Sequence, residues 1–287
     1  MRKRLLYFCS FVPEEMLRRA GFELISVYEL AHTGFQDTNL SGNPCSFIKL
    51  CSGINYSEYD GIIFTNCCNS TQRLYDYVKY HYPYLFTYLL ELPRSKEDIW
   101  NCNMLIMNLC EFFHMQPEAF FQKKYNAGEN SCELKAAEGT KAFSVKRGKS
   151  GLDGRNDLAI ITSCLSKEYA KELTAIFPEY KYSLSACFNE DRGESYLLGE
   201  RKVSCPRMLD FYNYVQERIQ EVRGVIFIAM QKCDHILFAY PAVRDICRKQ
   251  NIKILLVEEE YSFKISERSY IRYEAFKECL ELEQLYE

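Results

Sequence analysis

Two segments of the chain, one in each half, share the same order of features: a glycine, an apolar run, a cysteine, an amphipathic stretch and a second apolar run. The first is DGIIFTNCCNSTQRLYDYVKYHYPYLFTYLLELP, which begins at Asp60, and the second is RGVIFIAMQKCDHILFAYPAVRDICRKQNIKILLVEEEY, which begins at Arg223. Apolar runs that alternate with amphipathic stretches are typical of strands and helices that build a parallel sheet. The sequence therefore predicts an α/β fold of two Rossmann-like (flavodoxin-like), doubly wound domains with parallel sheets, related as an internal duplication.

The rest of the chain extends this alternation. Strands are expected at residues 4–9, 23–28, 59–65, 84–90, 158–162, 180–184, 224–229 and 252–257. Helices are expected at residues 13–20, 70–80, 98–122, 167–176, 206–221 and 242–249. A stretch rich in glycine, serine, asparagine and charge lies between the halves, so the domain linker is expected near residues 146–156. The predicted domains are residues 1–150, with Cys45 and Cys68, and residues 151–287, with Cys205 and Cys233.

Charge and hydropathy exclude several classes of partner. A net charge of −3 and a pI near 6.0 provide no global basic field to attract nucleic acid. No stretch approaches the roughly 18 to 20 apolar residues that a membrane helix needs, and no signal-peptide cleavage site follows the basic start. A cytoplasmic protein without nucleic-acid or membrane partners is therefore expected. The GxGxxG and GxxxxGK[ST] motifs are absent, so any ATP chemistry would belong to a partner protein.

Cysteines are the most informative candidate site residues. The chain has 14 of them and no export signal, so a disulfide framework is not expected in the reducing cytosol. In each repeated segment one cysteine, Cys68 or Cys233, falls where a strand ends and a helix begins, which is the edge of an open parallel sheet where ligands bind. A helix amino terminus is expected to stabilise the thiolate, the form that ligates iron, and to lower the cysteine pKa. The alternative is that these are small buried core residues, as free cysteines commonly are.

Further cysteines lie beside prolines upstream of the repeated segments, Cys45 in GNPCSF and Cys205 in VSCPRM. Cys45 opens a short apolar stretch and is expected at a helix start. The thiolates of Cys45, Cys68 and Cys233 are expected to converge in a cleft between the halves, with Cys205 and Cys187 near the same cleft. No CxxC motif occurs, so the spacing differs from that of zinc fingers and ferredoxins. The acidic run Glu258–Glu260 is interpreted as a solvated charge run.

Several stretches carry a resemblance to a known family. They are FVPEEMLRRAGFELISVYE, NPCSFIK, DGIIFTNCCNSTQRLYD, YLLELP, GVIFIAMQKCDHILFAYPAVRDICRKQNIKILLVEEEY and RSYIRYEAFKECLE. In this order they resemble a subunit of the 2-hydroxyacyl-CoA dehydratase and benzoyl-CoA reductase family. That family contains the D-component of 2-hydroxyglutaryl-CoA dehydratase, to which the stretches are similar, and it also includes double-cubane cluster proteins. The resemblance covers most of the chain. Because the chain begins at the first strand and is compact between Pro93 and Asp157, it is expected to be a shortened member.

Members of that family bind a [4Fe–4S] cluster through three cysteines per subunit, and some hold a double-cubane iron–sulfur cluster. By position, the resemblance implies that Cys45, Cys68 and Cys233 bind the cluster metal, with Cys205 as a further candidate. Cys68 is chosen over Cys67 because Asn69 is the nearest equivalent of the acidic residue that follows the family cysteine. His235 is the candidate catalytic residue, since it lies two residues after Cys233 and histidine titrates near neutrality.

The resemblance implies a lyase or oxidoreductase component of anaerobic metabolism that receives low-potential electrons from an ATP-dependent activator with its own iron–sulfur cluster. It also implies a homodimer or a heterodimer with a related subunit, and an acyl-CoA substrate. The shortened segments favour an alternative, a cluster-bearing electron carrier, accessory protein or double-cubane-type reductase without acyl-CoA chemistry. A third interpretation is a non-enzymatic α/β protein whose cysteines only pack in its core.

Overall fold

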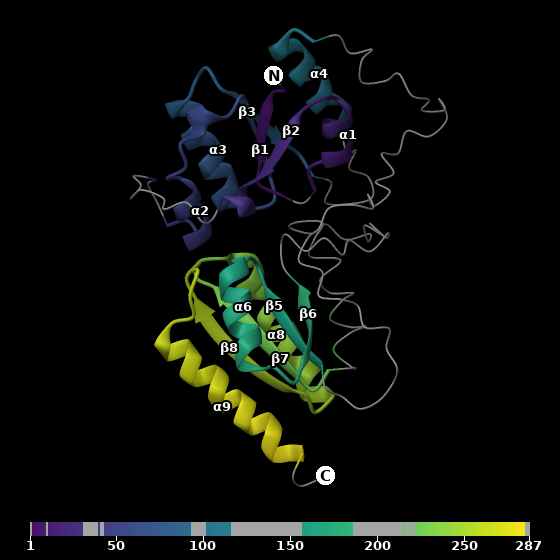
Figure 1. The fold of residues 1–287 in the computed structure, drawn as a ribbon, viewed down its shortest axis with the longest axis vertical. Coiled ribbons are helices and arrows are strands. Elements are labelled where there is room, and N and C mark those ends of the chain that lie inside the picture. The colour runs from purple at the N-terminus through teal and green to yellow at the C-terminus, as the bar shows by residue number, and fades with distance from the viewer. Residues whose placement is uncertain are drawn as a thin grey trace, which may run out of the picture. The chain divides into compact units, whose positions relative to one another are not determined.

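The computed structural model describes residues 2–9, 11–30, 40, 43–92, 102–115, 157–185, 215, 219 and 222–284. These residues form two four-stranded sheets in which every pairing is parallel, with helices on their faces (Figure 1). The predicted α/β class with parallel sheets is therefore confirmed. Within the described ranges, no helix combines the length and the apolar character needed to cross a membrane.

The N-terminal unit is built on a sheet with the strand order β2-β1-β3-β4. Its elements, in chain order, are β1 (Arg4–Tyr7), α1 (Glu14–Arg19), β2 (Glu23–Ser26), η1 (Val27–Glu29), α2 (Ser46–Cys51), η2 (Tyr56–Glu58), β3 (Gly61–Thr65), α3 (Asn69–His81), β4 (Phe86–Leu90) and α4 (Cys102–Phe113). The core against α1 and α4 contains Leu17, Leu105 and Leu109 from the helices, packed on Leu5 and Ile63 from the strands.

The C-terminal unit repeats this arrangement with the strand order β6-β5-β7-β8. Its elements are β5 (Asp157–Thr162), α6 (Lys167–Ile176), β6 (Lys181–Ser185), β7 (Gly224–Met230), α8 (Asp234–Lys249), β8 (Lys253–Glu259) and α9 (Glu267–Gln284). Helices α6 and α9 contribute Leu173 and Leu280 to a core against Ile160 and Ile226. The two sheets therefore have the same topology, as the repeated segments predict.

The two inner strands of each sheet, β1 and β3 in one and β5 and β7 in the other, also pair in an equivalent way. Leu5 lies opposite Gly61 across β1 and β3, and Leu158 lies opposite Gly224 across β5 and β7. Strands β3 and β7 are buried along their whole length, which explains why they are continuous apolar runs. Both begin with a glycine because space is short there: a Cβ on Gly61 would lie 2.9 Å from Leu5 Cδ2.

Some boundaries differ from the sequence prediction. Strand β2 ends at Ser26, two residues early, because the Ser26 hydroxyl accepts a hydrogen bond from the Tyr28 N–H at 3.4 Å and starts a 3-10 turn. Helix α8 begins at Asp234, as the position of Cys233 at a helix start predicts, and it continues through Pro241 to include the helix expected at residues 242–249. The predicted linker at 146–156 and most of the helix expected at 206–221 lie outside the described residues.

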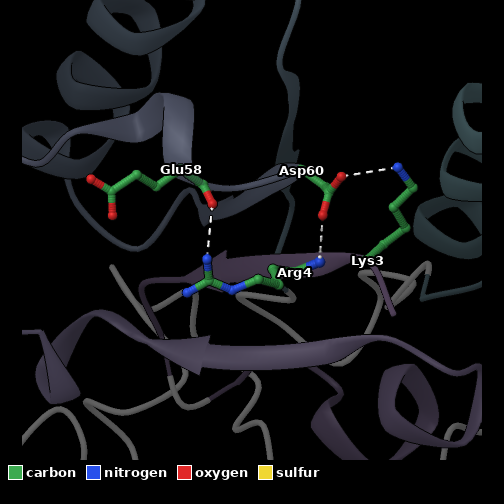
Figure 2. Close-up of polar contacts among 4 residues, drawn as sticks. All are labelled: Lys3, Arg4, Glu58 and Asp60. Atoms are coloured by element: carbon green, nitrogen blue, oxygen red, sulfur yellow. Dashed lines mark hydrogen bonds and ion pairs between the residues drawn. The ribbon is translucent and has the colours of Figure 1, made fainter. Parts of the chain in front are cut away.

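A polar cluster fixes the amino end of β1 to the turn before β3 (Figure 2). The Asp60 carboxylate accepts hydrogen bonds from the Arg4 N–H at 2.8 Å and from Lys3 Nζ at 3.0 Å, and the Arg4 guanidinium donates to the Glu58 carbonyl at 3.1 Å. Burial acts to raise the pKa of Asp60, but the Arg4 N–H and the Lys3 ammonium outweigh it and lower that pKa. This cluster holds the register of the two inner strands.

Candidate functional site

The two cysteines of the repeated segments occupy equivalent strand–helix junctions. Strand β3 ends at Thr65 and Cys68 is the N-cap of α3, whereas β7 ends at Met230 and Cys233 is the N-cap of α8. Both positions lie at the carboxyl edge of their own sheet, where open α/β folds bind ligands. Both residues are partly exposed.

Thr71, in the first turn of α3, organises the sulfur atoms around Cys68. Its N–H donates to Cys68 Sγ at 3.4 Å, and its hydroxyl oxygen lies 3.2 Å from Cys68 Sγ and 3.6 Å from Cys67 Sγ. Cys67 also interacts with Cys9, a buried residue just after the adjacent strand β1, and both pack in the same core cluster. Sulfur from three cysteines therefore gathers at this edge of the N-terminal sheet.

The pKa values of these thiols differ from the sequence expectation. The hydrogen bond with Cys67 and burial raise the pKa of Cys68 above the ordinary thiol range. For Cys67, the bond with Cys68 lowers the pKa, but the neighbouring Cys9 and burial outweigh it and raise the pKa to about 12. The expectation that the helix amino terminus lowers the pKa of Cys68 is therefore wrong for the protein chain alone. A coordinated metal ion would reverse this, because metal binding deprotonates a thiol.

Cys233 follows a tight turn that backbone hydrogen bonds fix. The Gln231 N–H donates to the Glu259 carbonyl at 2.8 Å, and the Cys233 N–H donates to the Met230 carbonyl at 3.0 Å. Between them Lys232 has a φ of 63°, in the left-handed region that non-glycine residues seldom occupy. His235, the candidate catalytic residue, lies partly buried in the first turn of α8.

Cys45 is buried and directly precedes α2, as the sequence predicts for a cysteine at a helix start. The division into compact units assigns residues Cys45–Phe47 to the same unit as β7 and β8. Within that unit the Ser46 hydroxyl accepts a hydrogen bond from the Tyr261 N–H at 2.7 Å and donates to Met230 Sδ at 3.1 Å. Ser46, the residue next to Cys45, thus contacts the end of β7, three residues before Cys233.

The other predicted ligands are outside what the structure describes. Cys187 and Cys205 lie in segments 186–200 and 201–214, which are not among the described residues. Among the residues that are described, no group of three or more His, Cys, Asp or Glu side chains could hold a metal ion. The sulfur atoms of Cys67 and Cys68 both contact the Thr71 hydroxyl, but neither unit by itself supplies a metal site from its described side chains.

The acidic run at the end of β8 is not fully solvated, contrary to expectation, because Glu259 is buried. Its Oε1 atom accepts a hydrogen bond from the Tyr169 hydroxyl at 2.9 Å and from the Ser266 hydroxyl at 3.4 Å. The Tyr169 hydroxyl also bonds the Tyr273 hydroxyl at 2.9 Å, and both rings are buried. This network joins α6, β8 and α9. Sequence reasoning missed it, as it missed Cys9 and Thr71.

Part of the chain is similar to a known protein family. Residues 9–116 match the family model of the 2-hydroxyglutaryl-CoA dehydratase D-component. The matched segment contains Cys45, Cys67, Cys68 and Thr71, whereas Cys233 lies beyond it. No curated protein matches the chain. Over residues 9–116 the match agrees with the resemblance stated from the sequence.

Proposed function

We propose that this chain, whose residues 9–116 match the 2-hydroxyglutaryl-CoA dehydratase D-component family, is an iron–sulfur cluster-binding subunit of a 2-hydroxyacyl-CoA dehydratase-like or benzoyl-CoA reductase-like system. It receives low-potential electrons from an ATP-dependent activator. The observation that carries the proposal is the position of Cys68, inside the matched segment and at the strand–helix junction of a parallel sheet.

Cys45, Cys68 and Cys233 are the residues that hold the cluster in this proposal. The donor chemistry fits, because thiolates are the usual ligands of iron–sulfur clusters. Two further features support it: Cys68 and Cys233 occupy equivalent N-cap positions in a duplicated fold, and Cys45 directly precedes a helix. When bound, a [4Fe–4S] cluster supplies one-electron transfer at low potential and an iron atom open to a substrate oxygen.

The residues of the chain have defined tasks in this proposal. Thr71 directs its N–H and hydroxyl at the Cys68 sulfur, and the backbone bonds of the Gln231–Cys233 turn orient the Cys233 sulfur. His235 follows Cys233 by two residues, and we assign it proton transfer at the substrate, since histidine changes its charge near neutral pH. Cys205 remains a further candidate ligand. The partners are the activator, an identical or related subunit, and an acyl-CoA, in the cytoplasm.

One observation favours a second candidate function. The family match ends at residue 116, so residues 117–287, including Cys233, are not covered by it. The second candidate is a cluster-bearing electron carrier, accessory protein or double-cubane-type reductase that lacks acyl-CoA chemistry, which the compact sequence between Pro93 and Asp157 favours. ATP-dependent turnover of an acyl-CoA in the presence of the activator separates the two candidates, because only the first requires it.

The deciding experiment is anaerobic purification followed by iron and sulfide analysis and an absorption spectrum. Wild-type protein is compared with Cys45→Ala, Cys68→Ala and Cys233→Ala. About four irons per chain are expected in wild type, as one [4Fe–4S] cluster requires, with a large loss in each variant. The matched controls are Cys110→Ala, at a core position in α4, and Cys279→Ala, at an exposed position in α9, and both should keep the iron. A folded wild-type protein without iron would overturn the proposal.

A further inference from the structure

Thr71 makes different contacts with the sulfur atoms of Cys67 and Cys68, which are adjacent in the sequence. Cys68 Sγ accepts a hydrogen bond from the Thr71 N–H at 3.4 Å and lies 3.2 Å from the Thr71 hydroxyl oxygen, a contact in which either atom can be the donor. Of these two Thr71 groups, Cys67 Sγ contacts the hydroxyl, at the longer distance of 3.6 Å. A hydroxyl has a single hydrogen to donate, so it can serve one of these sulfur atoms at a time. As a thiolate, the form that ligates iron, Cys68 has no hydrogen to donate, so it would accept the hydroxyl hydrogen through the shorter of the two contacts.

We propose that Thr71 is a positioning residue that makes Cys68, rather than Cys67, the cluster ligand, and that its hydroxyl tunes the reduction potential of the bound cluster. This inference rests on the proposed function. Hydrogen bonds to cluster sulfur atoms stabilise the more negative, reduced state and thereby raise the reduction potential. Thr71 is buried, so water does not readily replace its hydroxyl.

The duplication provides an internal comparison. Thr71 is the third residue after Cys68, and Ile236 is the third residue after Cys233. Both side chains are buried in the first turn of their helix, but isoleucine has no hydroxyl to donate. The Thr71 hydroxyl is therefore not needed to build this strand–helix junction, because the C-terminal unit forms the equivalent junction with an apolar side chain.

Thr71→Val is the informative variant. Valine keeps the branched shape and the backbone N–H that bonds Cys68 Sγ, and removes only the hydroxyl. Thr71→Ser is the matched control, since it restores the hydroxyl. Both are loaded anaerobically with ferrous iron and sulfide, and the midpoint potential is measured by a redox titration followed by electron paramagnetic resonance. The midpoint potential can be measured without turnover. If Thr71 had a purely structural role, the variant would not combine a shifted midpoint potential with a normal iron content.

The expected result is a normal iron content in both variants, with a more negative midpoint potential in Thr71→Val only. Loss of one such bond changes the equilibrium roughly fivefold, which corresponds to about 40 mV at the one-electron constant of about 59 mV per tenfold. Equal potentials in wild type and Thr71→Val would overturn the inference and leave the proposed function intact. Loss of the cluster in Cys67→Ala together with its retention in Cys68→Ala would overturn this inference and would also remove Cys68 from the ligands of the proposed function. Wild-type protein that binds no cluster would overturn both.

Discussion

Replacing Tyr169 by phenylalanine removes one buried hydroxyl and leaves the aromatic ring in place. That hydroxyl donates to Glu259 Oε1 at 2.9 Å and bonds the Tyr273 hydroxyl at the same distance. Burial first, and then the neighbouring Tyr273 and Glu259, raise the pKa of Tyr169, so it stays a neutral donor at ordinary pH. The variant therefore takes away a donor from a buried carboxylate without changing the packing of the core.

The loss of stability in Tyr169→Phe depends on which hydrogen bonds remain in the variant. Among the described residues, Glu259 Oε1 then keeps the hydrogen bond from the Ser266 hydroxyl, at the longer distance of 3.4 Å, and the buried Tyr273 hydroxyl loses its bond to Tyr169. A hydrogen bond to a charged group contributes about 1.5–3 kcal/mol, so Tyr169→Phe should lower the free energy of unfolding by about 2–3 kcal/mol. Tyr273→Phe leaves the bond to Glu259 intact and should cost only about 1 kcal/mol.

Urea unfolding followed by circular dichroism measures these differences, and hydrogen exchange of the β8 and α9 amides assigns the transition to the C-terminal unit. Tyr270→Phe is the matched control, because Tyr270 lies on the same helix as Tyr273 with an exposed ring, and its effect should stay within about 0.5 kcal/mol. If Tyr169→Phe is no more destabilising than Tyr270→Phe, the network does not hold these elements together and the reasoning fails.

Two further predictions test the inner strands. Gly61→Ala should lower the free energy of unfolding by about 1–3 kcal/mol, because the new Cβ would lie 2.9 Å from Leu5 Cδ2. Gly224→Ala should lower it less, since the nearest atoms to its new Cβ are 3.1 Å away. Urea unfolding that ranks the two variants the other way would contradict this. Asp60→Asn should cost about 0.5–1 kcal/mol at pH 7, because the pair with Lys3 is half exposed. Since the pKa of Asp60 is lowered on folding, its contribution is complete above the unfolded value near 4 and is lost as pH falls through the folded value. The difference between wild type and Asp60→Asn should therefore shrink as the pH falls, and a difference that stays constant from pH 7 into acid would refute the assignment.

The sequence predicts strands and helices best where one local signal dominates. Helix α6 was predicted at residues 167–176 and is observed at Lys167–Ile176, because Ser166 accepts a hydrogen bond from the Tyr169 N–H and marks its start. The strands β3 and β7 were found because burial on both sides requires continuous apolar runs. The continuity of α8 was harder to predict, because Pro241 suggests a break between the helix start after Cys233 and the helix expected at residues 242–249.

The contacts of the candidate site are predicted less completely than the helices and strands, because several of them join residues far apart in the sequence. The N-cap positions of Cys68 and Cys233 follow from local pattern, since each lies between an apolar run and an amphipathic stretch. The Cys9 interaction depends on which strands are neighbours, which only the three-dimensional pairing of β1 with β3 reveals. Glu259 looks solvated in a run of three glutamates, and its partner Tyr169 is 90 residues away in the chain.

The polar network around Glu259 also affects how the C-terminal unit folds while the chain is being synthesised. Tyr169 and Glu259 are made before Tyr273, which lies in the last helix of the described chain. Until α9 leaves the ribosome, the Tyr169 hydroxyl has no tyrosine partner and the apolar face that α9 covers is open to water. A nascent chain arrested before Tyr273 should therefore be a substrate for chaperones, and the release of the final helix completes the C-terminal unit.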